Sequence, residues 1–591
     1  MVRLPLKVRA MWLTARRAGL QRSFYRLDRR LRLQLLNPHL AHRLYPWPVL
    51  QDSHLLAPFA DGLLDQLKRL VCLRRLAASF QGWDQEQNTV RLLNQTPYPL
   101  RPPVDWLARP VDDPLWSFQL NSWDWAWPAL VEPAGRQAVR SLWLDWLDQA
   151  RIGHGVAWEP YPTSRRLIVW SLAWHMLGRD KRFAAAIAQQ AAYLARHLER
   201  DLDNNHLVAN AKALAWAGLL LPDLPGASIW RRQGLARLWD ALQAQVREDG
   251  GHVENSTGYH LSVWLDGLET MLLCRACGGM VPDNVSRILV TMGEYALALR
   301  RPDGRLPLLN DSIEDEPLPA TALFDLAAMA FNRADFAWAA GKKDANTTNR
   351  SSQMLADSGY AVLRSGSPPK ETYLVFDFGN LGPDHCPGHG HADTLSFELW
   401  SQGEALVVDP GTYQYPAGRW RNYFRSTAAH STATVDHLDQ SCFAGPFRVA
   451  DMAQGKLISH SLDKGRLEVV GEHNGYTRLA DPVIHRRHLR LFDAKHLTIV
   501  DYFSGAGHHH LALQFHLAPC EASLIGPDGA IAIYPGGTRL QLHCASSPPG
   551  RMQLEEGWVS RTWYQKETSP TLMYVLATKF PITITTTITI S

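Results

Sequence analysis

A succession of helix-length patterns occupies the first half of the chain and limits its fold more than any other feature. Short breaks, such as the proline- and glycine-containing turn at residues 222–226, separate consecutive patterns. Helical hairpins repeated in this way predict an α/α toroid over residues 111–340. Apolar residues recur at helical spacing over residues 135–149, 164–178, 182–199, 206–221, 227–246, 256–277, 283–300 and 318–340.

The second half of the chain changes to the two-residue alternation of β-strands. Its final strand pattern alternates isoleucine with threonine, and three earlier ones are also clear, at residues 373–378, 466–470, 496–500 and 582–590. We expect an antiparallel β-sandwich over residues 353–591, joined to the toroid by a polar linker at residues 341–352. The predicted fold class is therefore α+β multidomain.

Residues 1–110 form a separate, basic N-terminal region. Clusters such as Arg29-Arg30-Leu31-Arg32 lie among apolar residues at helical spacing. This pattern predicts one or two amphipathic helices that cover the next domain, with attachment to a membrane surface as the alternative. Residues 65–110 begin with a helical pattern and become irregular where prolines punctuate them.

Composition excludes several classes of protein. The formal charge of +4 permits an acidic ligand and does not indicate nucleic acid. Seven scattered cysteines do not form a disulfide framework, and the Cys274-x-x-Cys277 pair is interpreted as buried thiols. The first 20 residues lack the apolar core of a secretory signal, and no apolar run is long enough to span a membrane. The sequence by itself therefore predicts a cytoplasmic location.

Imidazoles and carboxylates flank a predicted β-hairpin that turns at Gln402-Gly403. His391, Asp409 and His430 are residue types that bind zinc or a similar divalent metal. The hairpin register places Asp409 opposite Ser396, so the segment around His391 must curl back for the three side chains to meet. The alternative is that these histidines satisfy backbone groups at a sheet edge.

Two loop-to-helix junctions in the helical half carry polar groups. At the first, Asn204 or Asn205 is an N-cap, while the free N–H groups of the helix end, with Asn205 and His206, suit a carboxylate ligand. At the second, Tyr259 lies in the first turn of a helix, as a packing residue or a catalytic one. Glu254 orients a neighbour or a sugar hydroxyl, or is a solvated first-turn acid.

Several of these motifs, in their order along the chain, resemble the heparinase II/III family of polysaccharide lyases. The likeness extends from about Trp116 to the end of the chain and also implies the toroid and sandwich fold. It is carried by Asn204–His206, by the segment from Glu248 to His260, by Gly388-His389-Gly390-His391-Ala392-Asp393, by Val407-Val408-Asp409-Pro410-Gly411-Thr412-Tyr413 and by the segment from Arg421 to Thr432.

The resemblance implies a lyase that cleaves an acidic polysaccharide beside a uronic acid by β-elimination. Asn205, with His206, would hold and polarise the carboxylate. Tyr259 and His389 would share the acid and base duties, in an order that depends on the epimer at C5. The resemblance also implies a cell-envelope or periplasmic location, which conflicts with the missing signal.

The resemblance assigns further roles to the segment after the hairpin. His391, Asp409 and His430 would hold a structural divalent metal, with zinc the expected ion. Arg421 and Arg425 either bind acidic groups of the polymer or are solvated surface arginines.

Two other classes of function stay open. A toroid also hosts glycoside hydrolases, which need paired carboxylates such as Glu254 and Asp393. A non-catalytic polysaccharide-binding or assembly protein is the other class, and the presence of Asn205, Tyr259 and His389 together counts against it. The sequence determines neither the polysaccharide nor the oligomeric state.

Overall fold

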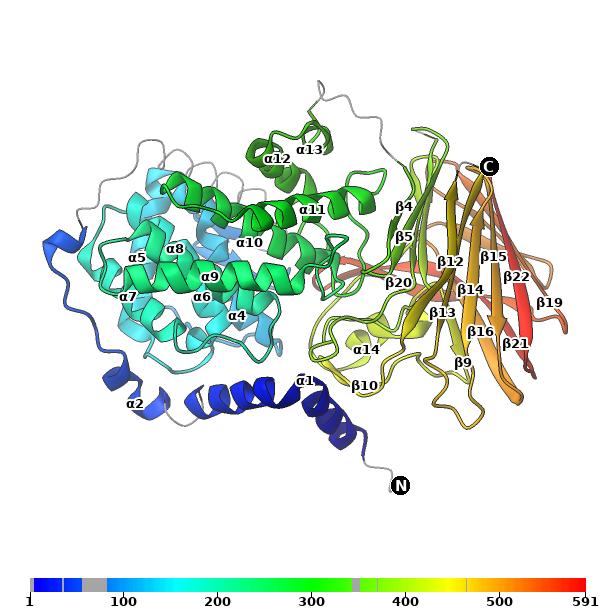
Figure 1. The fold of residues 1–591 in the computed structure, drawn as a ribbon, viewed down its shortest axis with the longest axis horizontal. Coiled ribbons are helices and arrows are strands. Elements are labelled where there is room, and N and C mark those ends of the chain that lie inside the picture. Colours follow the sequence, from blue (N-terminus) through cyan, green and yellow to red (C-terminus); the bar gives the residue numbers. More distant parts are fainter. Residues whose placement is uncertain (1–4, 34–36, 56–81, 343–350, 369, 464) are drawn as a thin grey trace.

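A computed structural model describes residues 5–33, 37–55, 82–342, 351–368, 370–463 and 465–591. A helical half and a β-rich half lie side by side, and the first helix runs beneath both (Figure 1). Among the described residues, no helix combines the length and apolar character needed to cross a membrane.

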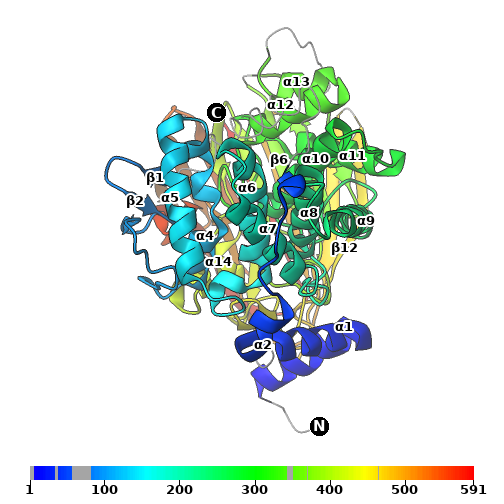
Figure 2. The same ribbon diagram turned by 90° about the vertical axis from the view of Figure 1, so that its left-hand side faces the viewer.

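The helical half is an α/α toroid, as predicted from the repeated helical patterns. Successive inner helices pack on one another, namely α4 (Pro114–Ser122), α6 (Pro160–Met176), α8 (Asn205–Leu220), α10 (Thr257–Ala276) and α12 (Ala320–Phe331). The outer helices are α5 (Pro133–Gln149), α7 (Lys181–Leu194), α9 (Ala227–Gln245), α11 (Asp283–Leu299) and α13 (Ala334–Ala339) (Figure 2). Almost every residue of α8 is buried, because it is surrounded by other helices. Single 3₁₀ turns supplement them at Asp124–Leu130 and Val156–Trp158.

The predicted helix over residues 318–340 is two helices in the structure. Asn332 ends α12 in the left-handed conformation, with φ of 52°, and α13 starts two residues later. Asparagine tolerates this conformation better than most residues, so it is a natural stop for a helix. The helix predicted from residue 164 begins earlier, at Pro160, because proline fits the first helical position.

The β-rich half contains antiparallel sheets that pack face to face. The largest has the strand order β12 (Gly455–Asp463), β13 (Arg466–His473), β14 (His485–Leu491), β15 (His496–Phe503), β22 (Ile582–Ile590), β19 (Arg539–Ser546), β18 (Gly529–Ile533), β17 (Glu521–Ile525). A four-stranded sheet has the order β20 (Arg551–Thr562), β21 (Gln565–Lys579), β16 (His508–His516), β9 (Ala433–Val435). A five-stranded sheet has the order β4 (Gln353–Leu355), β5 (Tyr360–Ser365), β6 (Thr372–Asp377), β7 (Phe397–Ser401), β8 (Glu404–Val407).

The five-stranded sheet joins the two halves because both of its faces are buried. On β6, Leu374 and Phe376 belong to the core of the sandwich, whereas Tyr373 and Val375 belong to the core of the toroid. Alternate side chains of a strand point to opposite faces, so a continuous apolar run serves two cores at once. The catalytic candidates described below lie near this junction.

The predicted hairpin is present as β7 and β8. Trp400 pairs with Ala405 across a turn in which Gln402 and Gly403 both have positive φ, as a two-residue hairpin turn requires. A register shift next to Leu399 moves β8 by one residue relative to the predicted pairing. The short helix α14 (Arg419–Arg425), a 3₁₀ turn at Thr427–Ala429 and the two-stranded β10 (Phe443–Gly445) and β11 (Arg448–Val449) follow.

The N-terminal region contains helices, as its pattern predicts. The first helix, α1 (Leu6–Leu31), contacts the toroid and, in addition, the β-rich half. It is interrupted at Gly19, whose φ of 72° is not helical. Next come α2 (Asn37–Leu44), a 3₁₀ turn at Asp52–Leu55 and the small sheet β1 (Gly82–Asp84), β2 (Thr89–Arg91), β3 (Tyr98–Pro99). The helical pattern expected from residue 65 and most of the predicted linker lie outside the described residues.

Candidate active site and metal site

A cleft of about 830 Å³ opens where the toroid, the β-rich half and α1 meet. The toroid contributes the first turns of α8 and α10, and the β-rich half contributes the loops that carry His389 and Tyr415. The predicted residues Asn205, His206, Tyr259 and His389 all line this one cleft. Tertiary structure thus brings together side chains that are up to 184 residues apart in the sequence.

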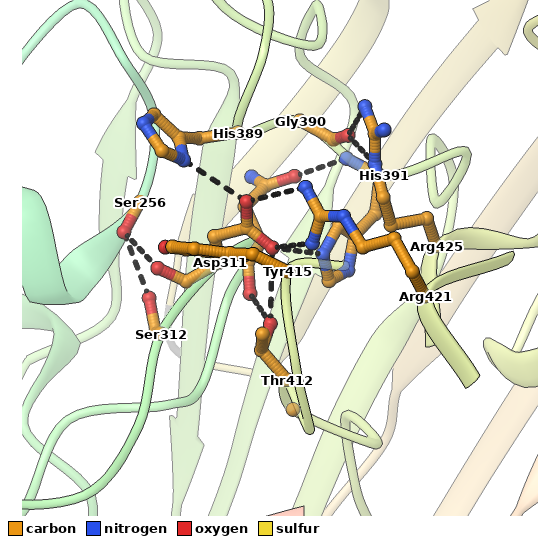
Figure 3. A network of polar contacts seen from close by, with 12 residues as sticks. Ser256, Asp311, Ser312, His389, Gly390, His391, Thr412, Tyr415, Arg421 and Arg425 are labelled. Carbon is orange, nitrogen blue, oxygen red and sulfur yellow. Dashed lines mark hydrogen bonds and ion pairs between the residues drawn. The ribbon is translucent and has the colours of Figure 1, made fainter. Parts of the chain in front are cut away.

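The buried carboxylate of Asp311 lies at the centre of the site (Figure 3). Its Oδ2 accepts hydrogen bonds from His389 Nδ1 at 2.9 Å and Arg421 Nη2 at 2.8 Å. Its Oδ1 accepts from His391 Nε2 at 3.1 Å, and from Arg421 Nη1 and Thr412. Burial opposes the charge, but Arg421 and the two histidines outweigh it, so the pKa of Asp311 lies well below its usual range.

This carboxylate fixes the tautomer of His389. Because ionised Asp311 can only accept hydrogen bonds, the neutral ring of His389 has its proton on Nδ1 and its lone pair on Nε2. The His389 side chain is 12% exposed and lines the cleft, with Nε2 3.8 Å from Glu254 Oε1. His389 is therefore oriented as a proton acceptor for a group bound in the cleft.

Two phenols lie next to this imidazole. The ring of Tyr259 is 4.1 Å from that of His389, centroid to centroid, and its hydroxyl is 2.8 Å from the hydroxyl of Tyr415. Burial raises the pKa of both tyrosines well above the usual value. Both phenols therefore keep their protons at neutral pH and are available as proton donors.

The first turn of α8 supplies the amide group of the site. Asn204 is the N-cap, since its side chain accepts a hydrogen bond from the backbone N–H of His206. Asn205 lines the cleft, and neither its buried acceptor Oδ1 nor its donor Nδ2 has a hydrogen-bond partner among the described residues. A buried amide without a partner is costly unless a polar ligand satisfies it. Asn205 is thus suited to a ligand in the cleft.

His206 places an ionisable imidazole beside this amide. Its Nδ1 is 3.1 Å from Glu199 Oε1, and its ring stacks on Tyr161. Burial works against the imidazolium, but the charge and hydrogen bond of Glu199 outweigh it, so the pKa of His206 is raised. A cationic side chain at this position favours an anionic ligand.

Glu254 orients its neighbours and is not a solvated acid. It is 1% exposed, and its carboxylate accepts hydrogen bonds from the Asn204 side chain and the Asn205 backbone N–H, both at 3.2 Å. It precedes α10 instead of lying in its first turn. Neither Glu254 nor Asp393 lines the cleft, so this pair does not have the arrangement that a glycoside hydrolase requires.

The three predicted metal ligands meet on the buried side of Asp311. Ligand atoms of His391, Asp409 and His430 all lie within 4.8 Å of one another. His391 donates from Nε2 to Asp311, and His430 donates from Nδ1 to the carbonyl of Ser426, so the two remaining nitrogens both present lone pairs. These nitrogens face each other at 3.3 Å, which is repulsive unless a cation lies between them.

The protonation of the three groups fits a cation. Burial lowers the pKa of His391 to about 4 and that of His430 well below its usual value, so both rings are neutral. Burial and the charge of Glu398 raise the pKa of Asp409 well above its usual range, a cost that a bound cation would offset. Two neutral imidazoles and one carboxylate are a donor set that zinc accepts.

Arg421 and Arg425 do not occupy the places predicted for them. Each is 1% exposed, and neither lines the cleft. Arg421 forms a two-pronged ion pair with Asp311, while Arg425 donates to the carbonyls of Gly390 and Pro446. With their donors already used inside the protein, they brace the loops of the site and are neither solvated nor placed to contact a polymer.

Asp311 and Tyr415 belong to the site but were not predicted from the sequence. Asp311 lies in a loop between α11 and α12 with no motif around it, and only its buried contacts reveal its role. Tyr415 follows two residues after the Tyr413 of the recognised motif. A search for polar residues flanking that motif would have found Tyr415.

Family models match both halves of the chain. The model described as heparinase II/III N-terminus matches residues 93–338, and heparinase II/III-like, C-terminal, matches residues 347–584. A protein named heparin-sulfate lyase from Bacteroides thetaiotaomicron is 27% identical over 372 residues, 58% of this chain and 50% of that protein. One of the same name from Pedobacter heparinus is 23% identical over 509 residues, 80% and 73% of the two chains. The chain spans about half the length of the first of these relatives.

Solved structures share the fold. The crystal structure of heparinase III superposes with a TM-score of 0.75 at 19% identity, covering 92% of this chain and 87% of that one. The heparan sulfate lyase HepC from Pedobacter heparinus gives a TM-score of 0.62 at 18% identity, with 96% and 87% covered. Both the toroid and the sandwich are therefore shared with these structures.

Proposed function

This chain belongs to the heparinase II/III family, and from that premise we propose that it is a polysaccharide lyase that cleaves beside a uronic acid by β-elimination. One observation carries the proposal. A neutral phenol and an imidazole with a free lone pair lie 4.1 Å apart, centroid to centroid, in a cleft that also presents an unpartnered amide. Elimination needs these three functions: an acid, a base and a group that stabilises the carboxylate as charge moves onto it.

The proposed roles follow from the state of each group. Asn205 and His206 bind the uronate carboxylate and lower the energy of the enolate-like intermediate. His389 Nε2 accepts the C5 proton, with Asp311 holding the ring in the required tautomer. Tyr259, protonated because burial raises its pKa, donates a proton to the departing C4 oxygen.

The alternative course, in which Tyr259 is both base and acid, requires a phenolate. Tyr259 is half-buried, and the loss of hydration disfavours that charge. We therefore favour His389 as the base and Tyr259 as the acid. The configuration at C5 then determines how well each substrate fits this arrangement.

We further propose that His391, Asp409 and His430 hold a structural divalent metal, with zinc the expected ion. The facing lone pairs and the buried carboxylate support this. The ion would cross-link the hairpin to the loop after α14, and through His391 it would help to fix Asp311.

The substrate class is an acidic polysaccharide. The curated relatives are named heparin-sulfate lyases, so a glycosaminoglycan of this type is the first candidate. Polymers of this kind are found outside the cytoplasm, and we propose a place in the cell envelope, which fractionation of the producing cells with an antibody would test.

The test is ultraviolet absorbance during incubation with a panel of uronate polysaccharides. Elimination leaves an unsaturated uronate that absorbs, and we expect Tyr259→Phe and His389→Ala each to lower its rate by about 10²- to 10⁴-fold. The matched controls are Tyr502→Phe and His460→Ala, which lie in exposed positions away from the cleft. New reducing ends without absorbance would refute elimination and favour hydrolysis. An intact polymer that remains bound would favour a non-catalytic role.

A further inference from the structure

Helix α1 forms one wall of the cleft and lies outside both family matches, which begin at residue 93. Thr14, Arg26, Arg29 and Arg30 line the cavity. Thr14 and Arg30 are 16 residues apart, a separation that corresponds to roughly 24 Å of helix. Figures 1 and 2 both place α1 against the lower edge of the molecule.

Contacts at both ends hold this wall in place. The half before Gly19 is attached to the β-rich half, and the half after it is attached to the loop that precedes α8. The partners are Arg9 with Asp451 at 2.7 Å, Arg17 with the Ala450 carbonyl at 2.9 Å, Arg22 with Asp203 at 2.5 Å and Arg29 with Asp201 at 2.8 Å. These ion pairs and hydrogen bonds occupy those arginines, while other arginines of the helix have no ion-pair partner in the part of the chain that the structure describes.

Arg30 is the clearest of the unpaired cations. It is exposed, it lines the cavity, and it makes no hydrogen bond or ion pair with the described part of the chain. Arg448 of β11 is also exposed and lines the same cavity. Arg26 is only loosely paired, 3.7 Å from Asp201, and its side chain is 27% exposed. Unneutralised guanidinium groups in a concave site attract anions.

Two of the acids that line the toroid side of the cleft are paired with cations. Asp124 forms a two-pronged ion pair with Arg165, and Asp266 accepts from Lys212 at 2.7 Å. The exposed arginines of the cleft wall lie on α1 and β11. Phe447 connects this region to the catalytic groups, since it is adjacent to Arg448 in sequence and its ring is 5.7 Å from that of His389.

We propose that Arg30 and Arg448, assisted by Arg26, form a subsite that binds sulfate or carboxylate groups of the polysaccharide next to the residue being cleaved. The inference rests on the proposed function, because the ligand is the same acidic chain. Guanidinium groups recognise either oxyanion by paired hydrogen bonds. This subsite gives α1, which no family model covers, a direct part in holding the substrate.

Binding without turnover tests the subsite. The full chain carrying Tyr259→Phe is titrated with size-defined heparan sulfate oligosaccharides, alone and with Arg30→Gln, Arg448→Gln or both. We expect each change to raise Kd by roughly two- to fivefold at low salt and to make the salt dependence of Kd shallower. The matched control is Arg16→Gln, which removes an exposed arginine of the same helix that does not line the cleft.

The outcomes separate the subsite from the lyase reaction. A rise in Kd that persists on desulfated oligosaccharides identifies carboxylate as the bound group, and one that disappears identifies sulfate. Equal Kd for Arg30→Gln, Arg448→Gln and Arg16→Gln, or no binding by any variant, overturns the subsite. If the arginine-dependent binding is found but the wild-type chain yields no unsaturated product, the proposed reaction fails and the subsite stands.

Discussion

The two sides of Asp311 present the same residue type in different surroundings. On one side His389 binds Oδ2 and reaches the cleft, with 12% of its side chain exposed. On the other side His391 binds Oδ1 and is fully buried against His430. One carboxylate thus orients two histidines that are two residues apart.

The comparison shows that exposure to the cleft, and not the hydrogen bond to Asp311, distinguishes the roles proposed for the two histidines. Both imidazoles donate to the same acid, so both present one nitrogen with a lone pair. His389 lines the cleft, where a ligand can reach its lone pair, whereas that of His391 faces only protein groups and is suited to a metal. Four predictions test this division between a reactive side and a structural side.

The largest effect is expected from replacing Asp311, which binds the histidines of both sides. Asp311→Ala should abolish measurable lyase activity and lower the free energy of unfolding by about 3–5 kcal/mol, because Arg421 is left as an unpaired buried charge. Urea unfolding and the product assay measure the two losses. Asp223→Ala, at an exposed position, is the control. An Asp311→Ala chain of native stability would contradict the central place given to this residue.

Removing one histidine from each side of Asp311 should separate the loss of activity from the loss of stability. His430→Ala is expected to release the metal and to lower the free energy of unfolding by about 2–4 kcal/mol. His389→Ala should lose activity while its stability falls by only about 1 kcal/mol, the worth of one hydrogen bond. Metal analysis of the purified chains, with urea unfolding, checks the split. Equal metal content in the two variants would remove the basis for a structural ion.

Asn204 and Asn205, at the start of α8, show the same division between a structural residue and a residue proposed to bind the substrate. Asn205→Ala should reduce kcat/KM by about 10²- to 10³-fold, because a preorganised donor to the carboxylate is lost. Asn204→Ala should instead cost about 0.5–2 kcal/mol of stability through the lost N-cap. Steady-state kinetics and thermal unfolding distinguish the two. A larger kinetic defect for Asn204→Ala would reverse the assignment.

The smallest effect concerns the charge of His206. Its pKa is raised, so the imidazolium is present at low pH and is lost as pH rises through that pKa. KM for a uronate substrate should therefore increase by about two- to fivefold across this range. His206→Gln should flatten the change, and a profile identical to that of the wild-type chain would exclude a role for this charge.

Much of the fold could be predicted because it depends on local patterns. The helices of the toroid and the hairpin at Gln402-Gly403 follow from periodicity and turn residues, which neighbouring residues determine. The prediction was wrong at Asn332, where one residue in the left-handed conformation divides a helix. It did not include the contact of α1 with the β-rich half, because the partners of its arginines lie far away in the chain.

The candidate site was predicted only in part, for a similar reason. The chemistry of Asn205, Tyr259 and His389 is visible in their residue types and in the motifs around them. The sequence could not show that Arg421 is buried or that Asp311 is its partner, 110 residues away. Burial and long-range pairing have no local signature, because they are properties of the packed chain.

The sequence by itself determined the two-part architecture and pointed to the candidate reactive groups and candidate metal ligands, since these reside in local order and side-chain chemistry. Only the tertiary structure decided which histidine faces the cleft, which arginines are consumed inside the protein and which remain free on α1. The physical reason is that solvent access and electrostatic compensation depend on groups brought together by folding, and no short stretch of sequence contains both partners.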